Sequence, residues 1–273
     1  MNGALDNAAA NIDPHQFAAS LRASNLDWIV PDWPVPSNVR ALTTTRNGGV
    51  SVGEYATLNL GRSRGDDPQA CAENQRRLET FLPRKPIWLD QVHGVAVATF
   101  DRNTPATLRP VADAAVTCEP DVVCAILTAD CLPVQFADRA GRAVGVAHAG
   151  WRGLAAGVLE ATVIALRDLN VAADQLVAWL GPAIGPACFE VGEEVRDAFC
   201  AADRDAAIYF TPHLPGKWHG DLHGLARQRL HRSGVTHVSG GGFCTFRETA
   251  RFFSYRRERE SGRMATAVWL ART

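Results

Sequence analysis

AVGVAHAGWRGLAAGVLEATVIALRDL, residues 143–169, carries the clearest secondary-structure pattern in the chain. Its first six residues form a short apolar run, which predicts a β-strand. From Gly153 to Leu169, four apolar residues and one threonine recur at helical spacing, namely Leu154, Val158, Leu159, Thr162 and Leu166. A strand that leads through a glycine turn into a helix is half of an α/β unit, so the chain is predicted to mix helices and strands.

Short apolar runs on both sides of this stretch predict further strands. They cover residues 39–45, 87–89, 95–100, 114–118, 122–127, 132–136, 176–180, 235–239 and 263–270. Further helices are predicted over 193–201 and 222–232. Another helix should follow Asp67 as N-cap, with Pro68 at its first position, and it should end before Pro83.

The chain shows no internal repeat, low-complexity block or linker that would divide it. Residues 1–25 are rich in Ala and Asn and have weak periodicity, so they are predicted to be a weakly structured N-terminal lead. Residues 26–273 are then predicted to form a single α/β (α+β) domain.

Composition excludes several classes of protein. The chain has 273 residues, 47% of them hydrophobic, which is enough for a sizeable core without disulfide or metal scaffolding. Its 28 Lys plus Arg nearly balance 29 Asp plus Glu, so nucleic-acid and membrane-surface binding are disfavoured. The N-terminus lacks the pattern of a secretory signal, and the seven cysteines include no C-x-x-C pair. We therefore expect a cytoplasmic protein with mostly reduced thiols.

Three polar motifs stand at the ends of predicted strands, where side chains distant in sequence can converge. They are DQVHG (90–94), TADCLP (128–133) and HAGWRG (148–153), and they supply His93, Cys131 and His148. Two imidazoles and one thiolate leave the fourth tetrahedral position free, which is typical of catalytic zinc. The alternative is that the histidines are hydrogen-bonded loop residues and the thiol is buried in the core.

Five segments in this order resemble the YfiH family: QVHG, ADCLPV, HAGWRG, GPAIGPACFEVG and FFSYRRERESGRMA. Members of this family have been labelled multicopper polyphenol oxidases, or laccase-like, and are associated with purine nucleoside phosphorylase activity. The likeness extends from about Trp28 to Trp269. It implies a single-domain mixed β-sheet sandwich flanked by helices, similar to a group of Cys-dependent toxin deamidases.

The resemblance also implies a site and an activity. His93, Cys131 and His148 match the metal-ligating trio of the family, with zinc as the usual metal, and all three are predicted to be catalytic. The implied reaction is phosphorolysis of adenosine, inosine and methylthioadenosine, with adenosine deamination as a further activity. The expected partners are therefore a purine nucleoside and phosphate, with no nucleic acid or membrane, and the protein is expected to be a monomer.

Four side chains are candidates for binding substrate. Arg46 lies in TTRNGG, whose glycines let backbone N–H groups approach an anion, and Arg152 enters the predicted Gly153 helix, so both are predicted to hold phosphate. Each could equally be a surface or core-capping arginine. Cys188 stands where the family often has two adjacent cysteines, and it is either a pocket-wall residue or part of loop packing. Glu190 is a possible acid or base, or a solvated group.

Asp130 is a further catalytic candidate, because a carboxylate beside Cys131 could orient a ligand histidine or carry a proton. Its side chain could also point to the opposite face of the strand. Trp151 and Phe189 could stack on a purine, although aromatic residues beside glycine loops are as often core. His219 and His223 have helical i, i+4 spacing but lack the H-E-x-x-H motif, so a solvated helix face is preferred.

Two other activities remain open from the sequence, a single-copper oxidase and a metal-free amide hydrolase. A full multicopper laccase is excluded because the chain has eight histidines and no H-x-H pair. A single copper in a His2Cys site is chemically feasible, with Met264 or a backbone oxygen as axial ligand. The other open activity is that of a metal-free amide hydrolase acting in peptidoglycan-precursor editing, with Cys131 as nucleophile and His148 or His93 as base.

Overall fold

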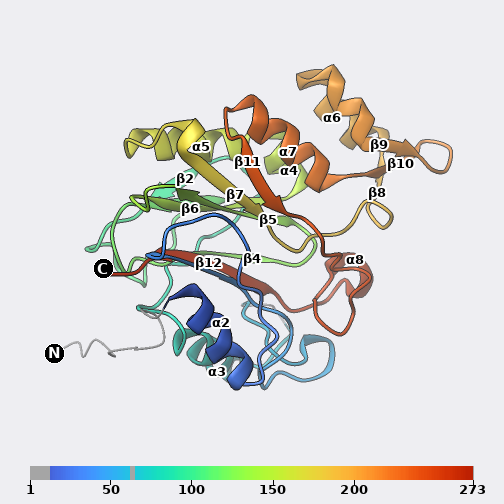
Figure 1. The fold of residues 1–273 in the computed structure, drawn as a ribbon. Coiled ribbons are helices and arrows are strands. Elements are labelled where there is room, and N and C mark those ends of the chain that lie inside the picture. The colour runs from blue at the N-terminus through green and yellow to red at the C-terminus, as the bar shows by residue number, and fades with distance from the viewer. Residues whose placement is uncertain (1–12, 62–64, 273) are drawn as a thin grey trace.

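The computed structural model describes residues 13–61 and 65–272 of the chain. Two β-sheets pack face to face, and helices cover the outer face of each, which gives four layers (Figure 1). Helices α5 (Val158–Asp168) and α7 (Leu222–Arg232) lie on the larger sheet, and α2 (Pro14–Ala23) and α3 (Pro68–Glu79) lie on the smaller one. The predicted mixed β-sandwich flanked by helices is confirmed.

The larger sheet has six strands and mixed direction. Their order across the sheet is β11 (His237–Gly240), β7 (Leu176–Leu180), β5 (Leu132–Asp138), β6 (Val144–Ala149), β3 (Ala114–Thr117) and β2 (Val97–Thr99). The two outer pairs, β11 with β7 and β2 with β3, are parallel, and the three inner pairs are antiparallel. The inner strands are buried on both faces, which explains why they are continuous apolar runs in the sequence.

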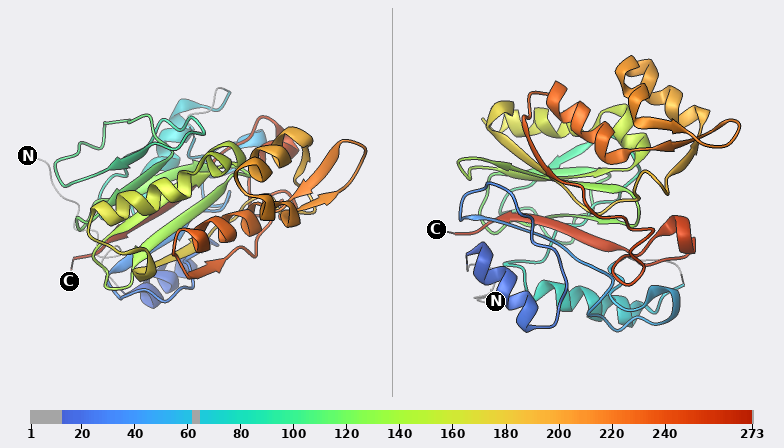
Figure 2. Two further views of the ribbon diagram at one scale, coloured as in Figure 1. Left: turned by 90° about the horizontal axis from the view of Figure 1, so that it is seen from above. Right: turned by 45° about the vertical axis from the view of Figure 1, so that its right-hand side comes forward.

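The smaller sheet is antiparallel, with the order β1 (Val39–Thr43), β12 (Met264–Leu270) and β4 (Cys124–Thr128). Apolar side chains from its inner face, such as Ile126 and Val268, meet Val146 of the larger sheet in a buried cluster between the two. A third sheet, β8 (Glu190–Gly192), β10 (Lys217–Gly220) and β9 (Phe210–Pro212), projects at one end of the molecule together with α6 (Glu193–Ala202) (Figure 2).

The stretch 143–169 forms β6 followed by two helices rather than one. Helix α4 (Trp151–Ala156) ends at Gly157, whose φ of 105° is left-handed, and α5 begins at the next residue. A glycine tolerates this backbone conformation, so the apolar spacing continues across a break that periodicity alone does not reveal. Helix α3 begins as predicted, with the Asp67 carboxylate accepting from the backbone N–H of Gln69.

Part of the predicted N-terminal lead is wrong. Residues 14–23 form α2, and the Asp13 side chain caps it by accepting from the backbone N–H groups of His15 and Gln16. Phe17 is fully buried and packs edge-on against Trp269, with ring centroids 5.8 Å apart. Burial of this aromatic side chain on the smaller sheet stabilises a helix whose average hydrophobicity is low. The rest of the lead up to residue 12 lies outside the described residues.

The strand predicted over 87–89 is also wrong. Ile87 forms only an isolated bridge with Cys124, so this segment follows the edge of β4 without forming a ladder.

Helix α8 (Tyr255–Glu258) is a single turn that precedes β12. None of the helices in the described part of the chain is long and apolar enough to cross a membrane.

Candidate metal centre and active site

The three predicted ligand residues lie together at one end of the larger sheet. The donor atoms of His93, Cys131 and His148 are all within 4.8 Å of one another, and Cys131 Sγ is 3.9 Å from His93 Nε2. The pairing of β5 with β6 explains part of this convergence, because Pro133 lies opposite His148 and Cys131 directly precedes β5. His148 is buried, Cys131 is partly buried and His93 is exposed, so the group opens toward solvent at His93.

Gly150 makes room for this convergence. A Cβ at this position would lie 2.9 Å from Cys131 Sγ and 2.9 Å from Cδ2 of His93, closer than side-chain carbons approach such atoms. The φ of Gly150 is −60°, which any residue can adopt, so the requirement for glycine here is steric rather than conformational. The glycine in HAGWRG therefore lets the exposed histidine reach the thiol.

Two side chains fix the loop that carries His93. The amide of Gln91 pairs with both backbone groups of Leu127, accepting from N at 2.8 Å and donating to O at 2.9 Å. The Asp113 carboxylate accepts from three successive backbone N–H groups, those of residues 92–94, at 2.7 to 3.2 Å. These contacts hold His93 in a left-handed conformation, with a φ of 62°.

Asp113 also orients His148, a role that sequence reasoning assigned to Asp130. Its Oδ1 is 2.8 Å from Nδ1 of His148, and its side chain has no solvent exposure. Burial tends to raise the pKa of Asp113, but hydrogen bonds from His148 and from backbone N–H groups outweigh it and lower the pKa. A hydrogen bond at Nδ1 leaves Nε2 of His148 as the ring nitrogen that could bind a metal. The one sequence signal that could have pointed to Asp113 is its position as an acidic residue inside the apolar run 111–116.

The cysteine and the buried histidine favour their charged forms. Burial would raise the pKa of Cys131, but the charge and hydrogen bonding of His148, supported by His93, lower it to about 6. Burial would lower the pKa of His148, but Cys131 and Asp113 raise it to about 9. The thiolate is the form of cysteine that binds metals and attacks electrophiles, so both kinds of chemistry are accessible here.

The residue types of the donor set fit a tetrahedral zinc ion, and the one donor–donor distance between Cys131 and His93 is close to what such an ion requires. Bonds of about 2.3 Å to sulfur and 2.0 to 2.1 Å to nitrogen place the two ligand atoms about 3.6 Å apart, within a few tenths of an ångström of the observed 3.9 Å. Within residues 13–61 and 65–272 this is the one group of three or more His, Cys, Asp or Glu side chains close enough to share an ion. Met264, the axial candidate for copper, is fully buried, and its sulfur accepts from the backbone N–H of Phe253 at 3.2 Å.

Asp130 joins the site to the segment that leads into β12. Its carboxylate accepts from the hydroxyls of Thr245 (2.6 Å) and Ser254 (2.9 Å) and from the backbone N–H of Arg256 (2.7 Å). Asp130 has a left-handed backbone, with a φ of 81°, immediately before Cys131. This carboxylate therefore fixes the segment 245–256 beside the candidate metal centre.

The two predicted phosphate holders differ in their surroundings. The Arg46 guanidinium donates to the Ala56 carbonyl (2.8 Å) and to Glu258 (3.2 Å), and it lies over the Phe253 ring. Its charge is thus already balanced by a carboxylate. Arg152 is exposed and stacks on the ring of Trp151 at 4.5 Å. A phosphate contact by either residue stays a prediction.

The other substrate-binding candidates lie outside the His-Cys-His group. Burial and the neighbouring thiol of Cys244 raise the pKa of Cys188, so these two cysteines are neighbours. Glu190 lies on β8, and its carboxylate is 3.4 Å from Nε2 of His213. Phe189 is buried in the hydrophobic core, as expected for a core residue rather than for an aromatic ring that stacks on a purine.

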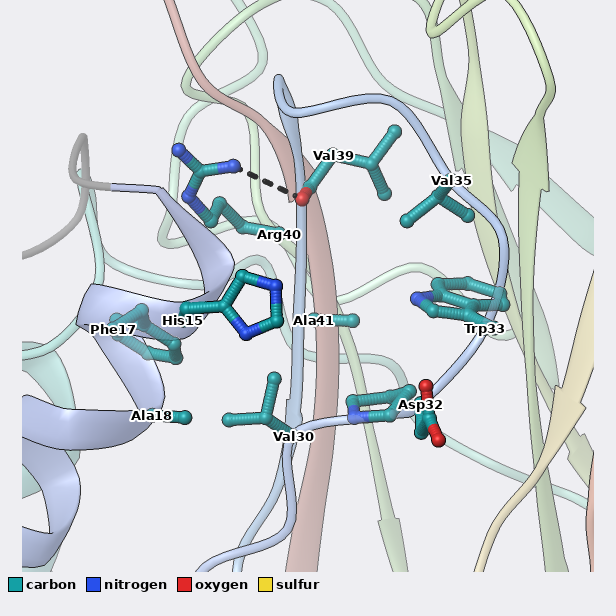
Figure 3. Close-up of a pocket in the computed structure, with 11 residues that line it drawn as sticks. His15, Phe17, Ala18, Val30, Asp32, Trp33, Val35, Val39, Arg40 and Ala41 are labelled. Atoms are coloured by element: carbon teal, nitrogen blue, oxygen red, sulfur yellow. Dashed lines mark hydrogen bonds between the residues drawn. The ribbon is translucent and has the colours of Figure 1, made fainter.

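A cavity of about 400 Å³ lies elsewhere in the molecule, between α2, β1 and the segment 30–35 (Figure 3). Its walls are mainly apolar, with His15, Asp32 and Arg40 as polar members. None of the predicted site residues lines it, so it is separate from the candidate metal centre.

The fold is a pair of β-sheets flanked by helices. In the described part of the chain it carries one candidate metal centre, the His2Cys group at the strand ends. The chain belongs to the family described as multi-copper polyphenol oxidoreductase laccase, whose model matches residues 40–271. The resemblance to the YfiH family is confirmed by relatives and solved structures that carry this name.

Relatives with strong similarity are named purine nucleoside phosphorylases. One from Pseudomonas aeruginosa is 57% identical over 244 residues, which cover 89% of this chain and 98% of the relative. The Escherichia coli protein, purine nucleoside phosphorylase YfiH, is 51% identical over the same shares of the two chains. Among solved structures, a Neisseria meningitidis protein of the DUF152 family is 47% identical with a TM-score of 0.84, over 90% of this chain and all of the other.

Proposed function

We propose that this protein binds one zinc ion through His93, Cys131 and His148 and phosphorolyses purine nucleosides such as adenosine, inosine and methylthioadenosine. The convergence of the three donor atoms within 4.8 Å carries the proposal. The names of relatives at 50 to 57% identity support the reaction class. We also propose that the protein is a monomer, which light scattering tests, and that it is cytoplasmic, which cell fractionation tests.

In this reaction an oxygen of inorganic phosphate forms a bond to C1′ of the ribose. The bond from C1′ to the purine nitrogen breaks, its electron pair leaves with the base, and the base takes up a proton. Bound zinc would supply a Lewis acid with an open coordination position that favours negative charge. The products are ribose 1-phosphate and the free purine.

The side chains of the protein prepare the site before substrate binds. Asp113 keeps the proton on Nδ1 of His148 and thereby fixes the ring. The same carboxylate holds the loop of His93 through backbone N–H groups, so one buried charge positions two ligands. Because the Asp113 carboxylate and the His148 ring are buried and hydrogen-bonded before substrate binds, we expect little reorganisation during the reaction.

The test is product analysis with purified protein and adenosine, with and without phosphate. We expect adenine and ribose 1-phosphate only when phosphate is present, loss of both with EDTA, and recovery with zinc. Adenosine deamination would release ammonia and inosine independently of phosphate. Absence of ribose 1-phosphate from a zinc-loaded protein would refute the phosphorylase proposal.

One observation favours a second candidate, a Cys-dependent amide hydrolase acting on peptidoglycan precursors. Cys131, His148 and Asp113 form a chain of contacts in which a thiol meets an imidazole and the imidazole meets a carboxylate. This is the arrangement of an activated nucleophile with its base and orienting group. Amide cleavage that survives EDTA and disappears with iodoacetamide would support it, and the opposite pattern supports the zinc enzyme.

A further inference from the structure

Arg263 lies at the same end of the sheets as the metal centre. Strand β12 pairs with β4 so that Met264 lies opposite Thr128. Arg263 directly precedes Met264, and Cys131 follows Thr128 by three residues. Both residues therefore stand just beyond the same pair of strand ends, although they are far apart in sequence.

The side chain of Arg263 is held by neutral groups. Its Nη1 donates to the carbonyl oxygens of Ser261 (2.7 Å) and Gly262 (3.0 Å). Its backbone N–H donates to Oδ1 of Asn59, and its carbonyl accepts from the N–H of Leu60. The guanidinium is thus positioned on one edge, and within the described residues Nε and Nη2 have no hydrogen-bond acceptor.

The charge of Arg263 also lacks a carboxylate partner within the described residues, unlike several arginines nearby. Arg46 and Arg257 both pair with Glu258, and Arg251 pairs with Glu248. Burial lowers the pKa of Arg263, whereas the negative charges of Cys131 and then Asp130 act in the opposite direction. A partly buried cation without a paired anion is unfavourable, so the site is suited to an anionic ligand.

We propose that Arg263 binds the phosphate co-substrate through its Nε and Nη2 edge. This inference rests on the proposed phosphorylase function. A planar guanidinium edge matches two oxygens of a phosphate and gives charge-assisted, bidentate hydrogen bonds. Because Nη1 is already anchored on Ser261 and Gly262, the free edge is held in place before phosphate arrives.

The structure favours Arg263 over the two arginines chosen from the sequence. Phosphate at Arg46 would have to compete with Glu258 for the same guanidinium. Arg152 is exposed on α4, where water screens its charge, and its guanidinium stacks on Trp151. Arg263 combines partial burial, a fixed edge and a position beside Cys131.

The test compares Arg263→Gln and Arg263→Lys with the matched control Arg142→Gln. Arg142 is an arginine at the opposite end of β5, paired with Asp138. With zinc-loaded protein, we expect Arg263→Gln to raise KM for phosphate by about 10- to 100-fold, as loss of charged hydrogen bonds does. KM for adenosine should change less than threefold. Arg263→Lys should recover part of the loss, and Arg142→Gln should match the wild type.

Calorimetric titration with inorganic phosphate, in the absence of nucleoside, gives a second readout. We expect Arg263→Gln to weaken phosphate binding by a factor similar to its effect on KM. Unchanged phosphate binding in Arg263→Gln would overturn the inference, and so would loss of bound zinc or an equal rise in both KM values. If the wild type binds phosphate through Arg263 but forms no ribose 1-phosphate, the phosphorylase proposal fails and the anion site stands.

Discussion

Replacement of Asp113 by Asn tests the orienting role of the buried carboxylate. Oδ1 of Asp113 accepts from the backbone N–H of His93 and from Nδ1 of His148, and Oδ2 accepts from the N–H groups of Val92 and Gly94. An amide has one acceptor oxygen, so the NH2 group of Asn must face two of these donors. Two of the four hydrogen bonds are then lost, whichever way the amide is turned.

The size of the effect follows from these contacts. Loss of an orienting partner typically lowers metal affinity by about 10- to 100-fold, which corresponds to about 1.4 to 2.8 kcal/mol of binding free energy. Two lost hydrogen bonds to a charged group, at about 1.5 kcal/mol each, should lower the free energy of unfolding of the zinc-free protein by about 3 kcal/mol.

Competition with a chromophoric chelator measures the zinc affinity, and urea unfolding of the zinc-free protein measures stability. The matched control is Asp138→Asn, because Asp138 is an equally buried carboxylate at the end of β5 and contacts Arg142 instead of a candidate metal ligand. The control should lose stability but keep its zinc affinity within twofold. Wild-type zinc affinity in Asp113→Asn would refute the reasoning.

Three further predictions concern other parts of the structure. Gly150→Ala should lower zinc affinity at least tenfold in the chelator titration, because the new methyl would lie 2.9 Å from the thiol sulfur of Cys131. Unchanged affinity would show that a methyl group at residue 150 does not displace the thiol. Phe17→Ala should lower the free energy of unfolding by about 3 to 5 kcal/mol in urea, whereas a loss below 1 kcal/mol would mean that α2 is not docked. Burial would raise the pKa of Asp138, but Arg142 lowers it, so this pair stabilises the fold above about pH 4. The stability gap between wild type and Arg142→Gln should therefore be full at neutral pH and shrink as the pH falls through the lowered pKa; a gap that grows in acid would disprove this linkage.

Local signals in the sequence predicted the long elements well. Helix α7 has the predicted bounds, because its buried face repeats at helical spacing over three turns. Asp13-Pro14 carries the same capping signal as Asp67-Pro68, but the Ala- and Asn-rich surroundings obscured it. The third sheet was missed because strands of three or four residues are too short to show alternation.

Of the candidate site, only the three residues that could hold a metal were predictable from the sequence. His93, Cys131 and His148 have distinctive chemistry and stand in recognisable motifs. The role of Asp113 depends on β3 lying next to β6, which places the carboxylate beside His148, and no local pattern encodes that neighbourhood. For Arg263 the decisive fact is which acceptors surround it, and that too emerges only in three dimensions.

X-ray absorption at the zinc edge, recorded on protein loaded with one equivalent of the metal, tests the proposed centre most directly. We predict one sulfur at about 2.3 Å, two imidazole nitrogens at about 2.0 Å and one light atom from water or buffer. In Cys131→Ala the sulfur shell should vanish. A wild-type spectrum without sulfur, or with more than one sulfur, would contradict a centre built from two histidines and a cysteine.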